Sequence, residues 1–382
     1  MSETLLKEVQ EKFTKTFNTV PLLVFSPGRI NIIGEHTDYN GGFVFPAAVN
    51  KGIAAALQKS DTGCSTAIAL DKDSTVVFEL DKLKPSKEGS WENYVFGVVA
   101  EIQNRNKIIG DFNIIFKGNI PGGAGMSSSA ALENSVVFGL NELFDLGLTK
   151  HEMILISQKA EHNYVGVNCG IMDQYASMFG IQDHALHLDC RSVEAIPYKI
   201  DFKAHQLMLI NTNVKHNLSD SAYNDRRSAC ERISELLGIE ALRDATEKDL
   251  EKVIDKVTPT NYQKALFVIQ ENARTIKAAK AIKDNDLELL GSLIYQSHTG
   301  LSDQYKVSCV ELDFLVAQAK KNKHVLGARM MGGGFGGCTI NLISKTEALS
   351  FGESVSKAYK NKFNNECSVY FIALSEGTHL VK

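Results

Sequence analysis

The sequence contains no pair of cysteines at the spacing that would hold a zinc ion. Its seven cysteines are scattered along 382 residues without a Cys-x-x-Cys motif, so neither a zinc knuckle nor the disulfide framework of a small secreted protein is expected. We therefore expect a protein of a reducing compartment. The cysteines are Cys64, Cys169, Cys190, Cys230, Cys309, Cys338 and Cys367.

Long apolar runs and an excess of positive charge are also missing. No stretch approaches the roughly 18 apolar residues that a membrane-spanning helix needs, and segment 1–13 has the pattern of a charged amphipathic helix without the apolar core of a secretory signal. The 41 Lys and Arg residues face 45 Asp and Glu, so no basic field should attract nucleic acid or an anionic membrane. We expect a cytoplasmic monomer that binds small molecules.

The chain lacks a Pro/Gly/Ser-rich linker, an internal repeat and a low-complexity tract. Its length nevertheless exceeds what one hydrophobic core usually fills, which favours two domains with a ligand cleft between them. We place the boundary near residue 200, which gives an N-terminal domain 1–200 and a C-terminal domain 201–382.

The first half of the chain alternates short apolar segments with turn-forming residues. Asn40-Gly41-Gly42 is typical of a hairpin turn. Apolar residues then recur at helical spacing from Leu132 to Phe144, and a second helix is expected at 152–165. Strands are predicted at 22–25, 42–49, 66–70, 75–80 and 112–116.

The second half is dominated by long charged helices. Two short strands and the apolar run 207–210 come first, and a pair of strands, 338–343 and 369–374, closes the chain. This order predicts an α+β fold with antiparallel strands. Helices are expected near 221–237, 261–283, 286–300, 308–322 and 346–360.

The first motif that indicates chemistry is a run of glycines and serines, Pro121-Gly-Gly-Ala-Gly-Met-Ser-Ser-Ser-Ala-Ala131. It follows a predicted strand and opens a helix, so its glycines and the helix N-terminus could turn N–H groups toward an anion such as phosphate. A serine-capped helix after a flexible turn is the alternative. No Walker A lysine follows the glycines, and the His-Arg-Asp and Asp-Phe-Gly motifs of protein kinases are absent.

A second motif places charged side chains around a loop. Glu35, His36 and Asp38 lie within four residues of each other, shortly after Arg29. Carboxylates and a histidine can hydrogen-bond adjacent hydroxyls, which suits a sugar or another polyol. The alternative is that the acids only neutralise Arg29 and cap the turn.

The segment Gly332-Gly-Gly-Phe-Gly-Gly337 matches Gly-x-Gly-x-x-Gly, but a dinucleotide site is not the interpretation we favour. It leads into the apolar strand 338–343, whereas a Rossmann fingerprint opens a helix after a first strand. We expect close backbone packing here instead, with the nucleotide loop as one candidate neighbour.

Taken in this order, the motifs resemble those of the GHMP kinases, the superfamily of galacto-, homoserine, mevalonate and phosphomevalonate kinases. The segment Gly28-Arg-Ile-Asn-Ile-Ile-Gly-Glu-His-Thr-Asp-Tyr-Asn40 is similar to the signature of the galactokinases, and Val167-Asn-Cys-Gly-Ile-Met-Asp-Gln174 resembles their catalytic segment. The resemblance covers the whole chain. It implies an α+β architecture, with an N-terminal domain like the second domain of ribosomal protein S5 and a ferredoxin-like C-terminal domain.

The resemblance also implies transfer of the γ-phosphate of ATP to the C1 hydroxyl of galactose. Asp173 would contact that hydroxyl with Arg29 beside it, while Ser129 and Glu161 would hold Mg²⁺. Trp91 and Tyr94 resemble positions that flank the adenine pocket. The implied sugar contacts are Glu35, His36, Thr37, Asp38, Gly170, Asp173 and Tyr223, and the implied ATP contacts are Gly123, Ala124, Gly125, Met126, Ser127, Ser128 and Ser129.

Three alternatives stay open at this point. Single residues such as Glu161 or Tyr223 could be a surface acid or a packing tyrosine, although Asp173 follows apolar Ile171-Met172 and needs a polar partner. The substrate could be a related sugar, such as N-acetylgalactosamine or arabinose. A protein that senses galactose and ATP without turnover is less favoured, because such proteins depart from the Ser-Ser-Ser-Ala stretch that residues 127–130 retain.

Overall fold

The computed structural model describes residues 2–87, 89–214 and 219–381, with the side chains of 2 and 219–224 left out. The helices of the first half are α1 (Ser2–Phe17), α2 (Glu92–Asn104), α3 (Ser128–Phe144), α4 (Lys150–Ala160) and α5 (Met172–Phe179). Its strands are β1 (Leu22–Asn31), β2 (Phe43–Val44), β3 (Pro46–Lys59), β4 (Ser65–Ala69), β5 (Ser74–Phe78), β6 (Phe112–Gly118), β7 (His184–Asp189) and β8 (Glu194–Lys199).

The second half alternates fewer strands with longer helices. Its helices are α6 (Ser219–Leu237), α7 (Glu247–Glu251), α8 (Pro259–Lys283), α9 (Leu287–Asp303), α10 (Val310–Lys321) and α11 (Ala348–Phe363). Its strands are β9 (His205–Asn211), β10 (Val325–Met330), β11 (Cys338–Ser344), β12 (Ser368–Phe371) and β13 (His379–Leu380). Among the described residues, no helix combines the length and the apolar character needed to cross a membrane.

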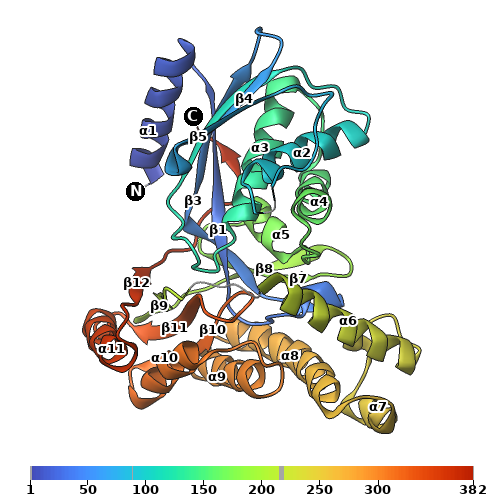
Figure 1. Cartoon of the computed structure of the whole chain (residues 1–382). Helices are drawn as coiled ribbons and strands as arrows, with labels where there is room; N and C mark the ends of the chain where they lie inside the picture. Colours follow the sequence, from blue (N-terminus) through green and yellow to red (C-terminus); the bar gives the residue numbers. More distant parts are fainter. Residues whose placement is uncertain (1, 88, 215–218, 382) are drawn as a thin grey trace.

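A six-stranded sheet of order β13-β1-β3-β6-β4-β5 forms the first layer. Successive side chains of a strand point to opposite faces, so Ala54 and Ala56 of β3 pack against α1 while Ala55 and Leu57 join the core beneath α2 to α5. Figure 1 shows α1 on one side of these strands and α2, α3 and α4 on the other. The sheet is therefore covered on both faces.

The second sheet has the order β10-β11-β9-β12 and lies against the helices of the second half. A third, smaller sheet pairs β2, β7 and β8. One core cluster contains residues from both halves, because Ile30, Ile32 and Ile33 pack with Leu290 and Ile340. The loop that follows β1 is thereby fixed against the second half.

Most predicted elements correspond to observed ones, with two corrections. Asn40-Gly41-Gly42 does not form a tight hairpin: β1 pairs with β3 across the long loop 32–45, and Gly41 ends a 3-10 turn before β2, which pairs with β7. The closing strands β11 and β12 do not pair with each other either, because β9 lies between them. Sequence patterns locate strands well but contain little information on their partners.

The division near residue 200 stays a prediction, with one addition from the topology. Residues 379 and 380 pair with Phe25 and Val24 of β1, so the polypeptide returns to the first sheet after completing the second. A domain 201–382 would therefore contribute one strand to the other domain.

Candidate active site

Two adjoining cavities lie where the loops of both halves meet. The larger has a volume of about 320 Å³ and the smaller about 150 Å³. Arg29, Gly332 and Gly333 line both of them, so the cavities share a wall.

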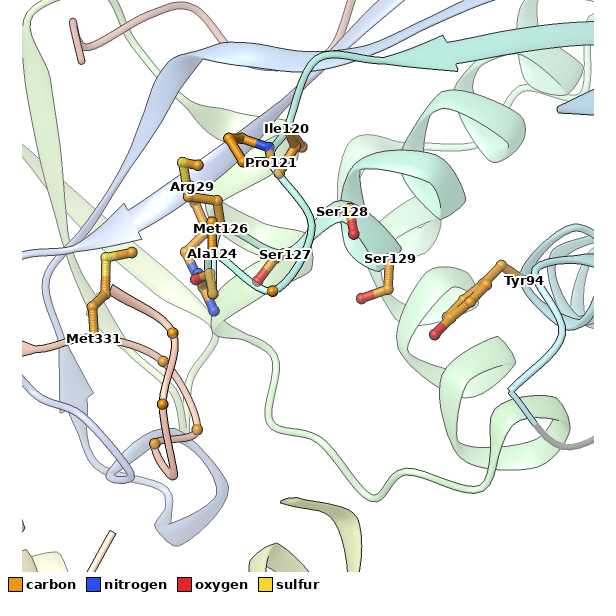
Figure 2. Close-up of a pocket in the computed structure, with 17 residues that line it drawn as sticks. Arg29, Tyr94, Ile120, Pro121, Ala124, Met126, Ser127, Ser128, Ser129 and Met331 are labelled. Carbon is orange, nitrogen blue, oxygen red and sulfur yellow. The ribbon is translucent and has the colours of Figure 1, made fainter. Parts of the chain in front are cut away.

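The glycine-serine segment forms one side of the larger cavity, and every predicted ATP contact lines it: Gly123, Ala124, Gly125, Met126, Ser127, Ser128 and Ser129. Gly123 and Gly125 have φ angles of 67° and 66°, in the left-handed region that glycine enters without strain. The segment ends at the N-terminus of α3, where unpaired N–H groups and the helix dipole favour an anion. Figure 2 shows the segment between Met331 on one side and Tyr94 on the other.

Arg29 and Asp173 form a bidentate ion pair at the junction of the cavities. Nε and Nη2 of Arg29 donate to Oδ1 and Oδ2 of Asp173, each at 2.8 Å. Arg29 lies in β1 and Asp173 in the first turn of α5, where the helix dipole favours a carboxylate. Burial disfavours the charged guanidinium, yet the nearby carboxylates, Asp173 above all, raise the pKa of Arg29. The pair predicted from separate motifs does come together.

Two further contacts tie this ion pair to the glycine-serine segment. Nη1 of Arg29 donates to the carbonyl oxygen of Gly125, and Oγ of Ser127 donates to Oδ2 of Asp173. The predicted role of Ser127 was nucleotide binding alone, and its contact with Asp173 is an additional finding. The sequence contained no signal for this contact. The contact depends on the left-handed backbone at Ser127 (φ 55°), which brings the side chain to α5.

The smaller cavity is lined by most of the predicted sugar contacts, namely Glu35, His36, Asp38, Gly170 and Asp173. Burial, followed by the negative charge of Asp173, raises the pKa of Asp38 to about 7. Gly170 makes room for that carboxylate, because a Cβ atom at residue 170 would lie 2.1 Å from Oδ2 of Asp38. The glycine is therefore required by its neighbour.

His36 is held as a neutral ring beside this cavity. Burial, together with the positive charge of Arg226, lowers the pKa of the imidazole to about 3. Its Nδ1 is 2.8 Å from the hydroxyl of Tyr39, which is 2.8 Å from the hydroxyl of Tyr305. A fixed neutral imidazole can orient a hydroxyl but would not supply a proton at neutral pH.

Thr37 is not among the described residues that line this cavity. Thr37 is fully buried, and its hydroxyl lies 2.9 Å from the carbonyl oxygen of Gly34 and 2.7 Å from that of Phe43. Its hydroxyl shapes the loop, and the predicted contact of Thr37 with the sugar stays a prediction. Tyr223 belongs to α6, but its side chain lies outside the described part of the structure.

Ser129 and Glu161 meet where the two cavities adjoin. Glu161 begins a π-helical turn after α4, and its buried carboxylate accepts hydrogen bonds from Ser129 and from Nε2 of Gln174, the latter at 2.8 Å. Burial and the charge of Asp173 raise the pKa of Glu161 to about 7. None of the described residues that shift the pKa of Glu161 is a cation. The hydroxyl of Ser129 and the carboxylate of Glu161 are oxygen ligands that suit a divalent cation at this place.

The two aromatic predictions separate in the structure. Tyr94 lines the larger cavity, whereas Trp91 packs edge-on against Phe116 with ring centroids 5.3 Å apart and donates to Ser74 at 3.3 Å. Tyr94 therefore fits a place beside the base of a nucleotide better than Trp91 does.

Comparisons with known proteins agree with this geometry. Residues 11–59 match the galactokinase galactose-binding signature, residues 93–181 the GHMP kinases N terminal domain and residues 278–361 the GHMP kinases C terminal. A galactokinase of Clostridium beijerinckii is 40% identical over 98% of both chains, and one of Thermotoga petrophila is 39% identical over 94% of this chain and 99% of its own. The chain belongs to the galactokinase family.

Solved structures place the fold in the same family. A galactokinase of Lactococcus lactis complexed with galactose superposes with a TM-score of 0.94, 34% identity and coverage of 98% of this chain and 100% of that one. A mevalonate kinase of Methanococcus jannaschii, at 16% identity and a TM-score of 0.64, shares the fold. The predicted α+β GHMP architecture is confirmed. Galactokinases are sugar kinases that use ATP, and this chain is an enzyme of that class.

Sequence reasoning missed two buried side chains that hold the galactokinase site together. Gln174 links Glu161 to the fully buried Glu133, with Nε2 at 3.3 Å from Oε2 of Glu133. Arg329 contacts Glu35. The sequence did contain one signal for Arg329, because it is the single charged residue of the apolar segment 325–330. A guanidinium buried in such a segment needs polar partners.

Proposed function

We propose that this chain transfers the γ-phosphate of ATP to the C1 hydroxyl of galactose. The observation that carries the proposal is the bidentate Arg29–Asp173 pair, which lies where a polyol-sized cavity with carboxylates meets a cavity with a glycine cradle. Relatives at 34% to 40% identity are galactokinases, and one was solved with galactose. Galactose therefore belongs in the smaller cavity and the triphosphate in the larger.

Positioning and charge neutralisation supply most of the catalysis in phosphoryl transfer. In our proposal Asp173 accepts the proton of the C1 hydroxyl as the bond to phosphorus forms, and Ser127 and Arg29 hold its carboxylate in place. Arg29 also neutralises charge that develops between the two substrates. The N–H groups of segment 123–129 bind the phosphates.

Ser129 and Glu161 are the residues that would hold Mg²⁺. The cation would neutralise charge on the phosphate oxygens. The pKa of Glu161 is raised because its negative charge is buried near Asp173, and a bound cation would balance that charge. Asp38, Glu35 and His36 would bind the remaining sugar hydroxyls. Each of the seven cysteines is free, which supports a reducing compartment such as the cytoplasm, and we propose that the chain acts as a monomer.

A panel of sugars tests this function directly. ADP release would be measured with galactose, N-acetylgalactosamine, arabinose and glucose at equal concentration, and the phosphorylated position would be assigned by phosphorus NMR. We expect galactose to give the highest kcat/KM and a product phosphorylated at C1. Faster turnover of another sugar would replace galactose as the substrate, and galactose binding without ADP release would identify a sensor.

A further inference from the structure

Arg329 is a fully buried charge in an edge strand of the second sheet, where it contacts the loop that follows β1. It lies in β10, with an exposed fraction of 0%, and is among the largest fully buried side chains. Burying a guanidinium is costly unless its donors are satisfied. Its Nε donates to the carbonyl oxygen of Ile32 at 2.9 Å, and its Nη2 donates to Oε2 of Glu35 at 2.8 Å and to the carbonyl oxygen of Asn31. These contacts tie Arg329 to residues 31–35, which we call the sugar loop.

Both carboxylate oxygens of Glu35 accept hydrogen bonds from the protein. Oε2 accepts from Arg329 and, at 2.7 Å, from Nδ2 of Asn31, while Oε1 accepts from the backbone N–H of Gly332 at 2.5 Å. A carboxylate oxygen accepts about two hydrogen bonds, so Oε1 has one position left for a sugar hydroxyl. Glu35 thus lines the sugar cavity and, through the same carboxylate, holds the glycine segment 332–337.

Gly332 passes this constraint to the nucleotide side. The φ angle of Gly332 is +82°, and a Cβ atom at this residue would lie 3.4 Å from Cα of Gly125. The backbone of the glycine segment 332–337 therefore packs against the backbone of the glycine-serine segment. Gly125 in turn accepts from Arg29, which pairs with Asp173. A continuous series of contacts leads from Arg329 through Glu35, Gly332, Gly125 and Arg29 to the reacting carboxylate.

We propose that Arg329 is a positioning residue that fixes Glu35 against Gly332, and that galactose and ATP strengthen each other's binding through this shared wall. The inference rests on the proposed function, because it assigns galactose and ATP to the two cavities. A sugar hydroxyl on the fixed carboxylate of Glu35 and phosphates on the segment packed against Gly332 would then hold the same wall from its two sides. Thermodynamic linkage then requires the nucleotide to tighten sugar binding by the same factor.

Calorimetry on the full chain measures this coupling. The dissociation constant of the magnesium complex of adenylyl imidodiphosphate, a non-hydrolysable ATP analogue, is determined with and without saturating galactose, and that of galactose with and without the analogue. We expect each ligand to lower the dissociation constant of the other about 5-fold or more in the wild type. In Arg329→Lys, which loses the planar fork, the factor should fall to within 2-fold of unity.

A matched control is a second buried arginine pair at the sugar loop. Nε of Arg274 donates to Glu271 at 2.7 Å, and Glu271 accepts from the N–H of Gly34, but neither side chain lines a cavity. Arg274→Lys should lower the melting temperature yet retain the coupling. If Arg329→Lys does not fold, Glu35→Gln is measured instead, because it weakens the contacts to Arg329 and Gly332 and predicts the same loss.

Three results would overturn the inference. They are wild-type coupling in folded Arg329→Lys, loss of coupling in Arg274→Lys as well, and a wild-type enzyme that phosphorylates galactose without any coupling. The last result would leave the proposed function intact. Failure of the wild type to bind galactose at all would instead contradict the proposed function itself.

Discussion

The two cavities of this chain are built in different ways. The nucleotide cavity is formed largely by two glycine-rich segments, 121–129 and 331–337, whose backbones approach each other. The sugar cavity is formed mainly by side chains of segments 29–38 and 161–173, and Gly332 and Gly333 add backbone only. In our proposal, triphosphate recognition therefore rests on the backbone, whereas sugar recognition rests on charged side chains.

The electrostatics of the cavities differ in the same sense. Arg29 is the charged side chain among the described residues that line the nucleotide cavity. The sugar cavity adds Glu35, Asp38, Glu161 and Asp173 to the same arginine. Substitutions on the sugar side should therefore act through charge, and substitutions on the nucleotide side through backbone conformation.

The largest effect is expected where the two cavities meet. Asp173→Asn should lower kcat about 10²- to 10⁴-fold and change galactose affinity only a few-fold, because a proton acceptor is removed while its shape is kept. Steady-state kinetics and calorimetry measure the two quantities. Asp189→Asn is the control, since Asp189 pairs with Arg243 at 2.5 and 3.0 Å but lines neither cavity. Near-normal kcat in Asp173→Asn would remove Asp173 from the chemistry.

A substitution at a residue that lines only the sugar cavity should affect galactose binding and not ATP binding. Asp38→Ala deletes a buried hydrogen-bond partner, which costs about 1 to 3 kcal/mol, so KM for galactose should rise roughly 5- to 100-fold. KM for ATP should change far less. Initial rates with each substrate varied in turn would show this, and an unchanged KM for galactose would contradict the assignment of Asp38.

A methyl group in the nucleotide cavity should have a moderate effect. Gly125→Ala forces a side chain at φ +66° and places Cβ 3.2 Å from the carbonyl oxygen of Met331, at a cost of about 1 to 2 kcal/mol. KM for ATP should rise roughly 5- to 30-fold. Gly63→Ala carries a similar backbone strain at φ +76° with open space around Cβ, and it should leave both KM values unchanged. Equal kinetics in the two variants would show that the packing on Met331 does not matter.

The smallest effect concerns stability and pH in the absence of substrates. The folded protein keeps the pKa of Asp38 at about 7, above the value in the unfolded chain, so this group favours folding at low pH and loses that contribution as pH rises toward 7. Asp38→Asn has no such dependence. Its melting temperature relative to wild type should therefore be higher at pH 8 than at pH 5, by about 2 °C for about 2 kcal/mol. The same offset at both pH values would contradict the raised pKa.

The sequence predicted the nucleotide cavity more completely than the sugar cavity, for a physical reason. The seven residues 123–129 are contiguous, so their local glycine pattern and the helix that follows indicated the cradle directly. The sugar cavity depends on contacts between distant residues. Resemblance to a family named Glu35 and Asp38, but no local pattern showed that Arg329 holds Glu35 or that Gly170 makes room for Asp38.

The fold was predicted to a similar extent. Helices α8 to α11 follow from apolar residues at helical spacing, and their bounds lie within a few residues of those expected. The partners of β2, β11 and β12 could not be predicted, because strand pairing depends on tertiary packing that no short segment encodes. The burial of Thr37 could not be predicted for the same reason, since it depends on the loop around it.

The pairing of residues 379 and 380 with β1 has a consequence for synthesis on the ribosome. The strand that carries Arg29 is made well before its neighbour at residues 379 and 380, because most of both sheets lies between them in the sequence. Until then, an apolar strand presents unpaired N–H and C=O groups that can recruit other chains. Chains that end before residue 379 should therefore leave that edge open and aggregate more readily than the full chain.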